Sequence, residues 1–168
     1  MDGRKLTIDQ KNVAELFNYN SDTGEIFWNV IGKGRTKKKA AGTVTSNGYV
    51  GVLIDGTRYY AHRIVWFLHH KKWPQNQIDH INGIKTDNRI ENLREATNSQ
   101  NGKNYGENKS NTSGFKGVSF CKQTNRWRAV IKVDGKTKSL GRFLKKNDAI
   151  EKRKTAEILY FGEWRRAV

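Results

Sequence analysis

Cysteine and proline are almost absent from this chain, whose 168 residues include one of each, Cys121 and Pro74. A single cysteine excludes an intrachain disulfide framework and a four-cysteine zinc site. Long apolar runs and basic amphipathic helices are also missing, so the pattern does not favour a membrane partner. The first ten residues, MDGRKLTIDQ, contain no apolar signal region. We therefore expect a cytoplasmic protein.

Acidic residues are scarce relative to basic ones. Asp and Glu total 16 against 32 Lys and Arg, which gives a formal net charge of +16 at pH 7. A surplus of this size calls for an anionic partner, and nucleic acid is the commonest one. The five tryptophans argue against a disordered chain. Residues 103–168 hold 17 of the 32 basic residues and only 6 of the 16 acidic ones, so the last part of the chain carries most of the surplus.

The first part of the chain alternates short helical and strand patterns. Residues 6–17 predict a short helix with an apolar stripe. Two apolar-rich strands joined at Asp55-Gly56 predict a hairpin. A helix that starts near His62 must end before Pro74. These patterns indicate an α+β fold.

A glycine- and lysine-rich loop precedes the hairpin. Its sequence, GKGRTKKKAAG, contains Lys37, Lys38 and Lys39. Two interpretations remain open at this point: a solvated charged loop, or a loop that contacts phosphate groups.

The last part of the chain predicts a three-stranded antiparallel sheet packed on one helix. The strands are expected at residues 116–122, 126–133 and 136–143, with a turn at Asp134-Gly135, and the helix at 147–162. A polar segment at 105–112 predicts a linker, which gives domains at 1–104 and 113–168.

Strand alternation in this sheet predicts one apolar and one basic face. The apolar face should pack on the helix through Ala149, Ala156 and Leu159. The middle strand contributes apolar Trp127, Ala129, Ile131 and Val133, and basic Arg126, Arg128 and Lys132. In the third strand, a shared face is predicted for Lys136, Lys138 and Arg142. A basic sheet face can bind in a DNA groove, and the alternative is a solvated face.

The segment IDHINGIKTDNRIENLREATNSQNGKN, residues 78–104, combines an Asp-His pair with six asparagines. A strand should end at Asp79-His80, a second strand should follow, and a helix should begin at Thr97 or Asn98. Asn101 would lie in the first turns of that helix, 22 positions after Asp79. This order of elements predicts that Asp79 and Asn101 come close together.

These residue types suit the cleavage of a phosphodiester. A neutral imidazole such as His80 can act as general base toward water. Carboxylate and amide oxygens such as those of Asp79 and Asn101 are hard ligands that suit Mg²⁺ or Mn²⁺. A divalent cation would supply Lewis-acid stabilisation of the phosphate and the leaving oxygen.

The same segment resembles the ββα-metal core of HNH endonucleases, in the homing-endonuclease branch. The Asp-His pair, DNRIENLR and the final asparagine cluster carry the resemblance, and YNSDTGEIFW, AGTVTSNGYVGVLIDGTRYYAHRIVW and HKKWPQNQIDH extend it upstream. The segment from residue 113 to residue 162 is similar to the DNA-binding domain of plant ethylene-response factors. Together these resemblances cover nearly the whole chain.

The resemblance implies specific roles. His80 would be the general base, and Asp79 and Asn101 would hold one divalent cation. Asn92 would brace the loop and help to orient His80, while His62 would have a structural or phosphate-contacting role. DNA contacts are implied for Lys116, Arg126, Arg128 and Lys132, although family strands carry arginines where this chain has Ser119 and Cys121.

The resulting hypothesis is a metal-dependent, site-specific DNA endonuclease with a tethered DNA-binding domain, which acts on double-stranded DNA without a small-molecule cofactor. One alternative is a DNA-binding regulator whose nuclease core is inactive. Another is an RNA-binding or ribosome-associated protein, although the chain lacks an aromatic-rich stacking motif of the usual kind. In a third, Asp79 and His80 belong to a merely structural, salt-bridged turn. No motif indicates an oligomeric state.

Overall fold

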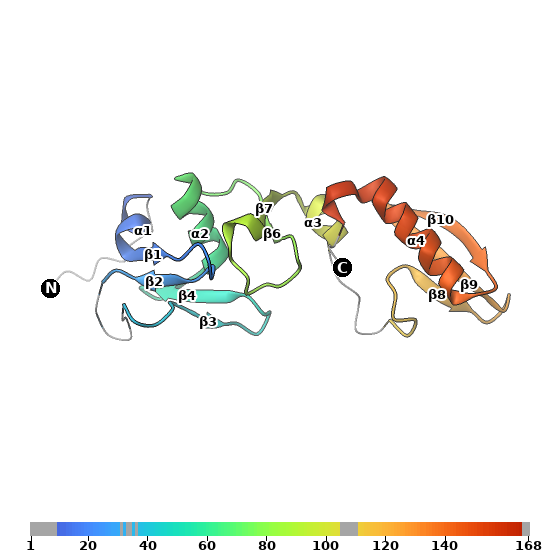
Figure 1. Ribbon diagram of the computed structural model, residues 1–168, viewed down its shortest axis with the longest axis horizontal. Helices are drawn as coiled ribbons and strands as arrows, with labels where there is room; N and C mark the ends of the chain where they lie inside the picture. The colour runs from blue at the N-terminus through green and yellow to red at the C-terminus, as the bar shows by residue number, and fades with distance from the viewer. Residues whose placement is uncertain (1–9, 31, 33–34, 36, 105–110, 166–168) are drawn as a thin grey trace. The chain divides into compact units, whose positions relative to one another are not determined.

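The computed structural model describes residues 10–30, 32, 35, 37–104 and 111–165 (Figure 1). The chain divides into two compact units, residues 1–97 and residues 98–168, and each is described by itself. Helices and strands are mixed in both units, in agreement with the predicted α+β class. The predicted domain limits at 104 and 113 stay predictions, and most of the predicted linker lies outside the described residues.

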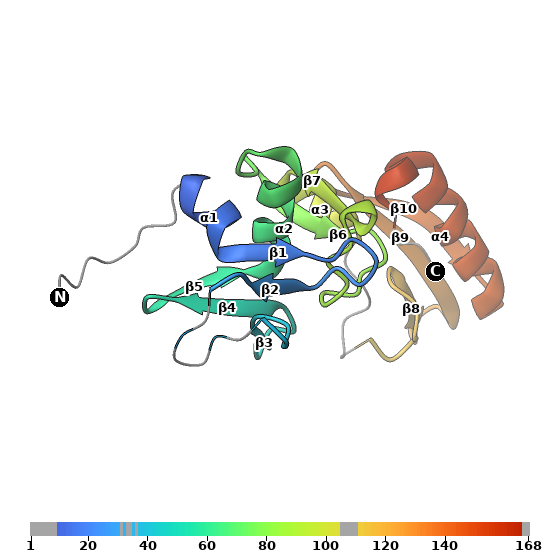
Figure 2. The ribbon, with the colours of Figure 1, turned by 60° about the vertical axis from the view of Figure 1, so that its left-hand side comes forward.

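The first unit contains two β-hairpins, a small sheet and two helices. The helix α1 runs directly into β1, which turns back as β2 (Figure 2). The strands β3, β4 and β5 form an antiparallel sheet in that order, and α2 packs on β4 and β5. The bounds are α1 Gln10–Leu16, β1 Phe17–Tyr19, β2 Ile26–Trp28, β3 Thr43–Val44, β4 Val50–Ile54, β5 Thr57–Tyr60, α2 Ala61–His70, β6 Gln77–His80, the 3₁₀ helix η1 Ile90–Asn92, and β7 Leu93–Ala96.

The predicted hairpin and the helix after it are confirmed. Asp55 and Gly56 take φ angles of 46° and 81°, as a two-residue turn between right-twisted strands requires. The helix α2 begins at Ala61 and ends at His70, four residues before Pro74. These elements deliver His62 to the first turn of α2.

The predicted helix at residues 6–17 extends one residue too far at its end. Phe17 is the first residue of β1 and pairs with Trp28 on β2, where the two ring centroids lie 4.4 Å apart. Aromatic cross-strand pairing therefore outweighs the helical periodicity at this position. The start of the predicted helix lies outside the described residues.

The core of the first unit holds the β6–β7 hairpin in place. Ile78 on β6 and Leu93 on β7 are buried in the same cluster as Ile26, Val52 and Ile64. Because side chains alternate along a strand, the residues next to Ile78 and Leu93 point to the other side of the hairpin. The hairpin thus fixes Asp79 and Arg94 relative to a packed core.

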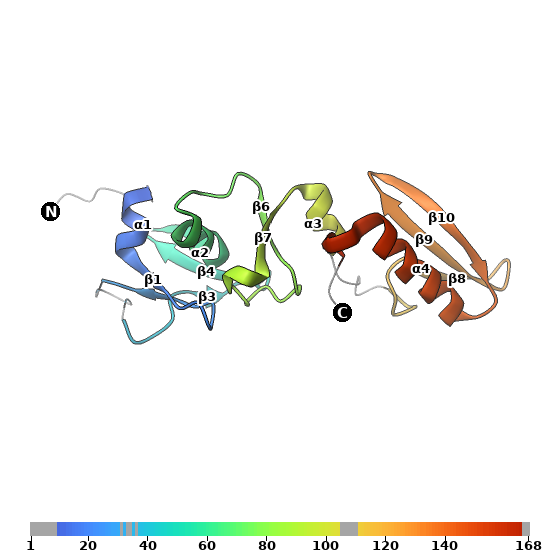
Figure 3. The same ribbon diagram turned by 45° about the horizontal axis from the view of Figure 1, so that its top comes forward.

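The second unit has the predicted sheet and helix. The strands β8, β9 and β10 are antiparallel with β9 in the middle, and α4 covers one face of the sheet (Figures 1 and 3). The predicted turn at Asp134-Gly135 is confirmed by φ angles of 49° and 79°. The bounds are α3 Asn98–Asn104, β8 Val118–Cys121, β9 Arg126–Val133, β10 Lys136–Phe143, α4 Lys146–Phe161, and the 3₁₀ helix η2 Gly162–Trp164.

The predicted common face for Lys136, Lys138 and Arg142 is wrong. The register of β10 shifts between Ser139 and Gly141, which marks a β-bulge. Before the bulge, Lys138 pairs with Ile131 on the helix-covered face, and its Nζ lies 4.5 Å from the centroid of the Tyr160 ring on α4. Lys136 pairs with Val133 of the same face. Only Arg142, after the bulge, belongs to the basic face.

The predicted packing of α4 holds in part. Ala149 and Ala156 are buried against the sheet together with Ala129 and Ile131. Leu159, in contrast, is 73% exposed, so its predicted burial is wrong. Arg153 is buried on this helix instead.

Candidate active site and basic surfaces

The β6–β7 hairpin places the Asp-His pair. Asp79 lies opposite Arg94, and His80 lies opposite Leu93. Asp79 is 5% exposed and His80 is 4% exposed, which is unusual for such polar side chains. Buried polar groups of this kind need defined partners, and these partners determine what the pair can do chemically.

Asp79 forms an ion pair with Arg94 across the two strands. Arg94 Nε donates to Asp79 Oδ2 over 2.9 Å, and Arg94 Nη2 lies 2.8 Å from the same oxygen. Both contacts reach the same carboxylate oxygen, so Arg94 fixes the orientation of the Asp79 side chain. The arrangement fits a structural role for Asp79, and it also orients an oxygen ligand for a metal.

His80 is held by an asparagine that the sequence does not single out. His80 Nε2 lies 3.0 Å from Asn88 Oδ1. With Oδ1 as the acceptor, Nε2 carries the proton and Nδ1 is the nitrogen with the lone pair. Burial lowers the pKa of His80, while the contact with Asn88 and the charge of Asp79 oppose that shift. The imidazole is therefore neutral near pH 7, as a general base must be.

Asn92 closes the loop between the two strands. Its Nδ2 donates to Asp87 O over 2.8 Å, and its Oδ1 accepts from the Asn82 N–H over 2.9 Å. Asn92 O also accepts from the Ile81 N–H. These contacts agree with the loop-bracing part of its predicted role. Asn92 was also predicted to help to orient His80, and the side chain that hydrogen-bonds the His80 ring is that of Asn88.

Aromatic rings and a second histidine surround His80. The ring centroid of His62 lies 5.2 Å from that of His80 in an edge-on arrangement, and Tyr60 stacks on His62 at 5.4 Å. Tyr49 contacts both histidines. His62 is 7% exposed, and burial lowers its pKa to about 3, so it stays neutral at ordinary pH. His62 therefore supports the position of His80 by ring packing.

Asn101, the second predicted metal ligand, lies on α3 in the unit formed by residues 98–168. The pairing of Asp79 with Asn101 stays a prediction. Among the described residues, no cluster of three or more His, Cys, Asp or Glu side chains could hold a metal ion. A carboxylate with an amide oxygen is a different donor set, and water and substrate phosphate complete such a shell around Mg²⁺. The donor types thus fit a hard divalent cation.

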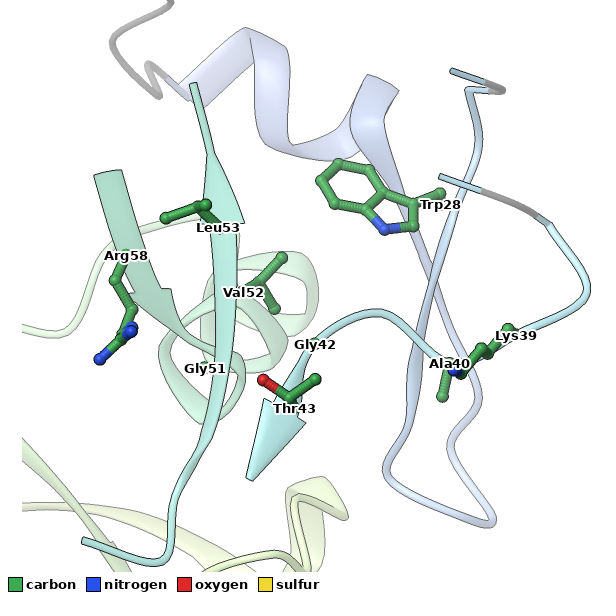
Figure 4. A pocket seen from close by; sticks show the side chains of 9 residues that line it. All are labelled: Trp28, Lys39, Ala40, Gly42, Thr43, Gly51, Val52, Leu53 and Arg58. Atoms are coloured by element: carbon green, nitrogen blue, oxygen red, sulfur yellow. The ribbon is translucent and has the colours of Figure 1, made fainter. Parts of the chain in front are cut away.

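The lysine-rich loop contributes exposed charge near a cavity. Lys37, Lys38 and Lys39 are all exposed, whereas parts of the loop before them lie outside the described residues. Lys39 lines a cavity of about 360 Å³ together with Arg58. Figure 4 shows these two cations on opposite sides of Gly42 and Thr43. The loop therefore offers cations to an anionic ligand, and its contact with phosphate stays a prediction.

The basic face of the second unit consists of Arg126, Arg128, Lys132 and Arg142. All four are exposed, and Arg128 lies opposite Arg142 on one side and Ser119 on the other. None of the strand positions that pair with these four is acidic. The cationic face is therefore larger in β9 than in β10, because the bulge turns Lys136 and Lys138 away.

Comparison with known proteins supports the nuclease interpretation for part of the chain. Residues 59–103 match the family model of the HNH endonuclease. Over 59 residues the chain is 42% identical to Protein 3.8 of Escherichia phage T7, which corresponds to 35% of this chain and 49% of that protein. The chain thus spans about half the length of the relative it matches. No solved structure matches this chain.

The matched segment contains most of the candidate site. It includes the end of β5, all of α2, β6 and β7, and most of α3, and therefore His62, Asp79, His80, Asn88 and Asn92. An HNH endonuclease domain in this segment indicates a nuclease. None of the helices in the described ranges has both the length and the apolar character needed to span a bilayer.

Proposed function

We propose that the protein is a metal-dependent, site-specific DNA endonuclease of the homing type that hydrolyses phosphodiester bonds in double-stranded DNA. The observation that carries this proposal is the buried His80 beside the buried Asp79, whose carboxylate pairs with Arg94, within the segment that matches the HNH endonuclease family. A neutral imidazole at that position can act as a general base and accept a proton from a water molecule.

His80 accepts the proton of the attacking water at Nδ1. Asn88 accepts from the Nε2–H of the imidazole, which makes Nδ1 the unprotonated nitrogen and stabilises the charged ring once the proton has moved. His62 and Tyr49 limit the rotation of the ring and shield it from bulk water. Asn92 braces the loop that carries Asn88.

Asp79 and Asn101 would hold one divalent cation, Mg²⁺ or Mn²⁺. When bound, the cation supplies Lewis-acid stabilisation of the phosphate and of the leaving oxygen. Arg94 fixes the direction of the Asp79 carboxylate before any ligand arrives. Such preorganisation reduces the cost of assembling the site.

The basic surfaces bind DNA. The C-terminal domain, which resembles the DNA-binding domain of ethylene-response factors, is tethered to the nuclease domain. Its sheet grips the duplex and raises the local concentration of the nuclease at its site. The loop lysines Lys37, Lys38 and Lys39 add affinity without sequence information.

Metal-dependent cleavage tests the proposal. Supercoiled plasmid and a long, varied DNA pool should be cut with Mg²⁺ or Mn²⁺, and the cutting should cease in EDTA and return when metal is restored. An open-circle product would identify a nickase. If duplex DNA is bound tightly but no DNA in the pool is cut with either metal, the endonuclease proposal is wrong.

One observation favours a second candidate, a DNA-binding regulator with an inactive nuclease core. Asp79 already has a cationic partner in Arg94, so its charge is balanced without a metal. In that case the ion pair is purely structural, and the protein binds duplex DNA without hydrolysis under every metal condition.

A double substitution tests DNA binding by the basic face. Arg126→Ala combined with Arg128→Ala should reduce the affinity for duplex DNA about tenfold or more per arginine. The slope of log affinity against log salt should also fall by about two, because each lost phosphate contact releases one counterion fewer. Both quantities come from fluorescence anisotropy at several salt concentrations.

The matched control removes two lysines from the helix that covers the opposite sheet face, Lys152→Ala with Lys154→Ala. Affinity should then change little. Equal losses in both double variants would mean that only net charge matters. Unchanged affinity in the arginine variant, with an unaltered circular dichroism spectrum, would refute a DNA-binding role for this face.

A further inference from the structure

A cationic cavity lies within the second unit, apart from the exposed sheet face. Its volume is about 430 Å³, within the range of ligand-binding cavities. It is lined by parts of α3, the segment before β8, the β9–β10 turn and the end of α4. The charged side chains in its wall are Lys103, Lys116, Lys132 and Arg153, against the single acidic residue Asp134.

Arg153 is the buried member of this set. It is 2% exposed, and its Nη1 lies 2.7 Å from Glu157 Oε1 one helical turn away. Within the described part of the chain, its Nε has no hydrogen-bond partner. Burial lowers the pKa of Arg153, which reflects the cost of desolvating the guanidinium. A buried donor without a partner leaves that cost unbalanced unless a ligand accepts from it.

The backbone makes room for this guanidinium. A Cβ atom at Gly117 would lie 2.6 Å from Arg153 Nε and 2.4 Å from Val130 O, so no side chain fits there. Gly117 also has a φ angle of 76°, which favours glycine. The chain thus brings its backbone close to a buried cation instead of covering the cation with an apolar side chain.

Two of these cations lie close to the same aromatic ring, that of Phe161. Arg153 Cζ lies 5.6 Å from the centroid of the Phe161 ring, and Lys103 Nζ lies 5.8 Å from it. Lys116 Nζ lies 3.4 Å from Gly102 O on α3, next to Lys103. Like charges gathered in a partly desolvated cavity repel each other, and an anion with several acceptor oxygens relieves that repulsion.

We propose that this cavity is an oxyanion site that takes a phosphate group of the DNA backbone. The guanidinium N–H of Arg153 and the ammonium groups of the three lysines provide charge-assisted donors for its oxygens. Lys132 belongs to the exposed basic face as well, so the positive charge is continuous from that face to the cavity. The site deepens the proposed function by adding a phosphate contact away from the sheet face.

The test uses the full chain and two probes, inorganic phosphate and a labelled DNA duplex in EDTA. The variant Lys103→Gln with Lys116→Gln keeps Arg153 in place. Its matched control is Lys152→Gln with Lys154→Gln, which removes the same charge from exposed positions of α4. Thermal unfolding with increasing phosphate reports the anion site, and anisotropy against salt reports contacts with the DNA backbone.

We expect phosphate to raise the unfolding temperature of the wild type and the control but not of the cavity variant. Duplex affinity of the cavity variant should fall about tenfold or more, with a salt slope smaller by about one, because one phosphate contact is lost. Loss of the phosphate effect with unchanged duplex affinity would overturn the assignment to the DNA backbone in favour of a free phosphate compound. Equal behaviour of both double variants with both probes would overturn the site itself.

Two further measurements keep the result interpretable. If the double variant unfolds, Lys103→Gln alone, at a half-exposed position, should show the same changes at about half the size in the salt slope. Metal-dependent cleavage by the wild type is measured in parallel. Its absence would contradict the nuclease proposal without affecting phosphate binding, and its presence beside an unresponsive cavity variant would contradict the anion site only.

Discussion

Replacement of His80 by alanine is expected to reduce DNA cleavage by about 10²–10⁴-fold and to leave the affinity for duplex DNA unchanged. The loss follows from the removal of the only group that we assign as proton acceptor. Affinity is retained because the cations of the basic face and of the lysine loop are untouched. Plasmid cleavage rates with Mg²⁺ or Mn²⁺, beside anisotropy in EDTA, measure the two effects separately.

The control for this substitution is His69→Ala, which removes an exposed histidine at the end of α2 and should cleave like the wild type. His80→Gln serves as a second variant, because it fills more of the buried space than alanine. It should be as inactive as His80→Ala. Cleavage near the wild-type rate in either His80 variant would exclude His80 as the base. A parallel loss of DNA binding would show that the two functions cannot be separated.

Local sequence patterns were sufficient for the elements that depend on neighbours in the chain. Asp55-Gly56 and Asp134-Gly135 both form the predicted hairpin turns, because positive φ angles at these residue types decide the turn. The three strands and the helix of the second unit also lie where predicted. The Asp-His pair stands at the end of a strand, as the order of apolar and polar residues indicated.

Features that depend on register or on tertiary contacts were missed. A strict period of two places Lys136, Lys138 and Arg142 on one face, but a single bulge changes the phase and no residue type announces it. On α4, Leu159 is exposed although its burial was predicted, whereas Arg153 is buried. The glycine at position 117 leaves room for the Arg153 guanidinium, a tertiary contact that helical periodicity alone does not reveal.

The same distinction between local sequence pattern and tertiary contact applies to the candidate site. Its ionisable members could be identified from the sequence, whereas the partners that tune them could not. Asn88 is one of several asparagines in the segment, and only the closed loop shows that it reaches His80. The contact of Asp79 with Arg94 requires the register of β6 against β7. The ion pair with Arg94 matters most, because it is consistent with two roles of the Asp79 carboxylate: a metal ligand, or a purely structural partner of Arg94.

The substitution Asp79→Asn gives different results for these two roles. The substitution keeps the size of the side chain and removes its charge, so we expect cleavage to fall by about 10²–10³-fold through loss of an anionic metal ligand. The unfolding free energy should fall by about 1–3 kcal/mol, because Arg94 then faces a neutral amide in a largely buried place. Cleavage at saturating metal and denaturant unfolding give the two quantities.

The double substitution Asp79→Asn with Arg94→Gln decides between a ligand and a structural ion pair. Two neutral amides can hydrogen-bond across β6 and β7 without a buried charge, so much of the lost stability should return. Cleavage should not return, because the oxygen ligand remains uncharged. Arg94→Gln alone should be destabilised, and Mn²⁺ should raise its unfolding temperature more than that of the wild type, since the cation then balances the Asp79 carboxylate. If the double variant recovers both stability and cleavage, Asp79 serves only the ion pair, and the metal must be held by other residues.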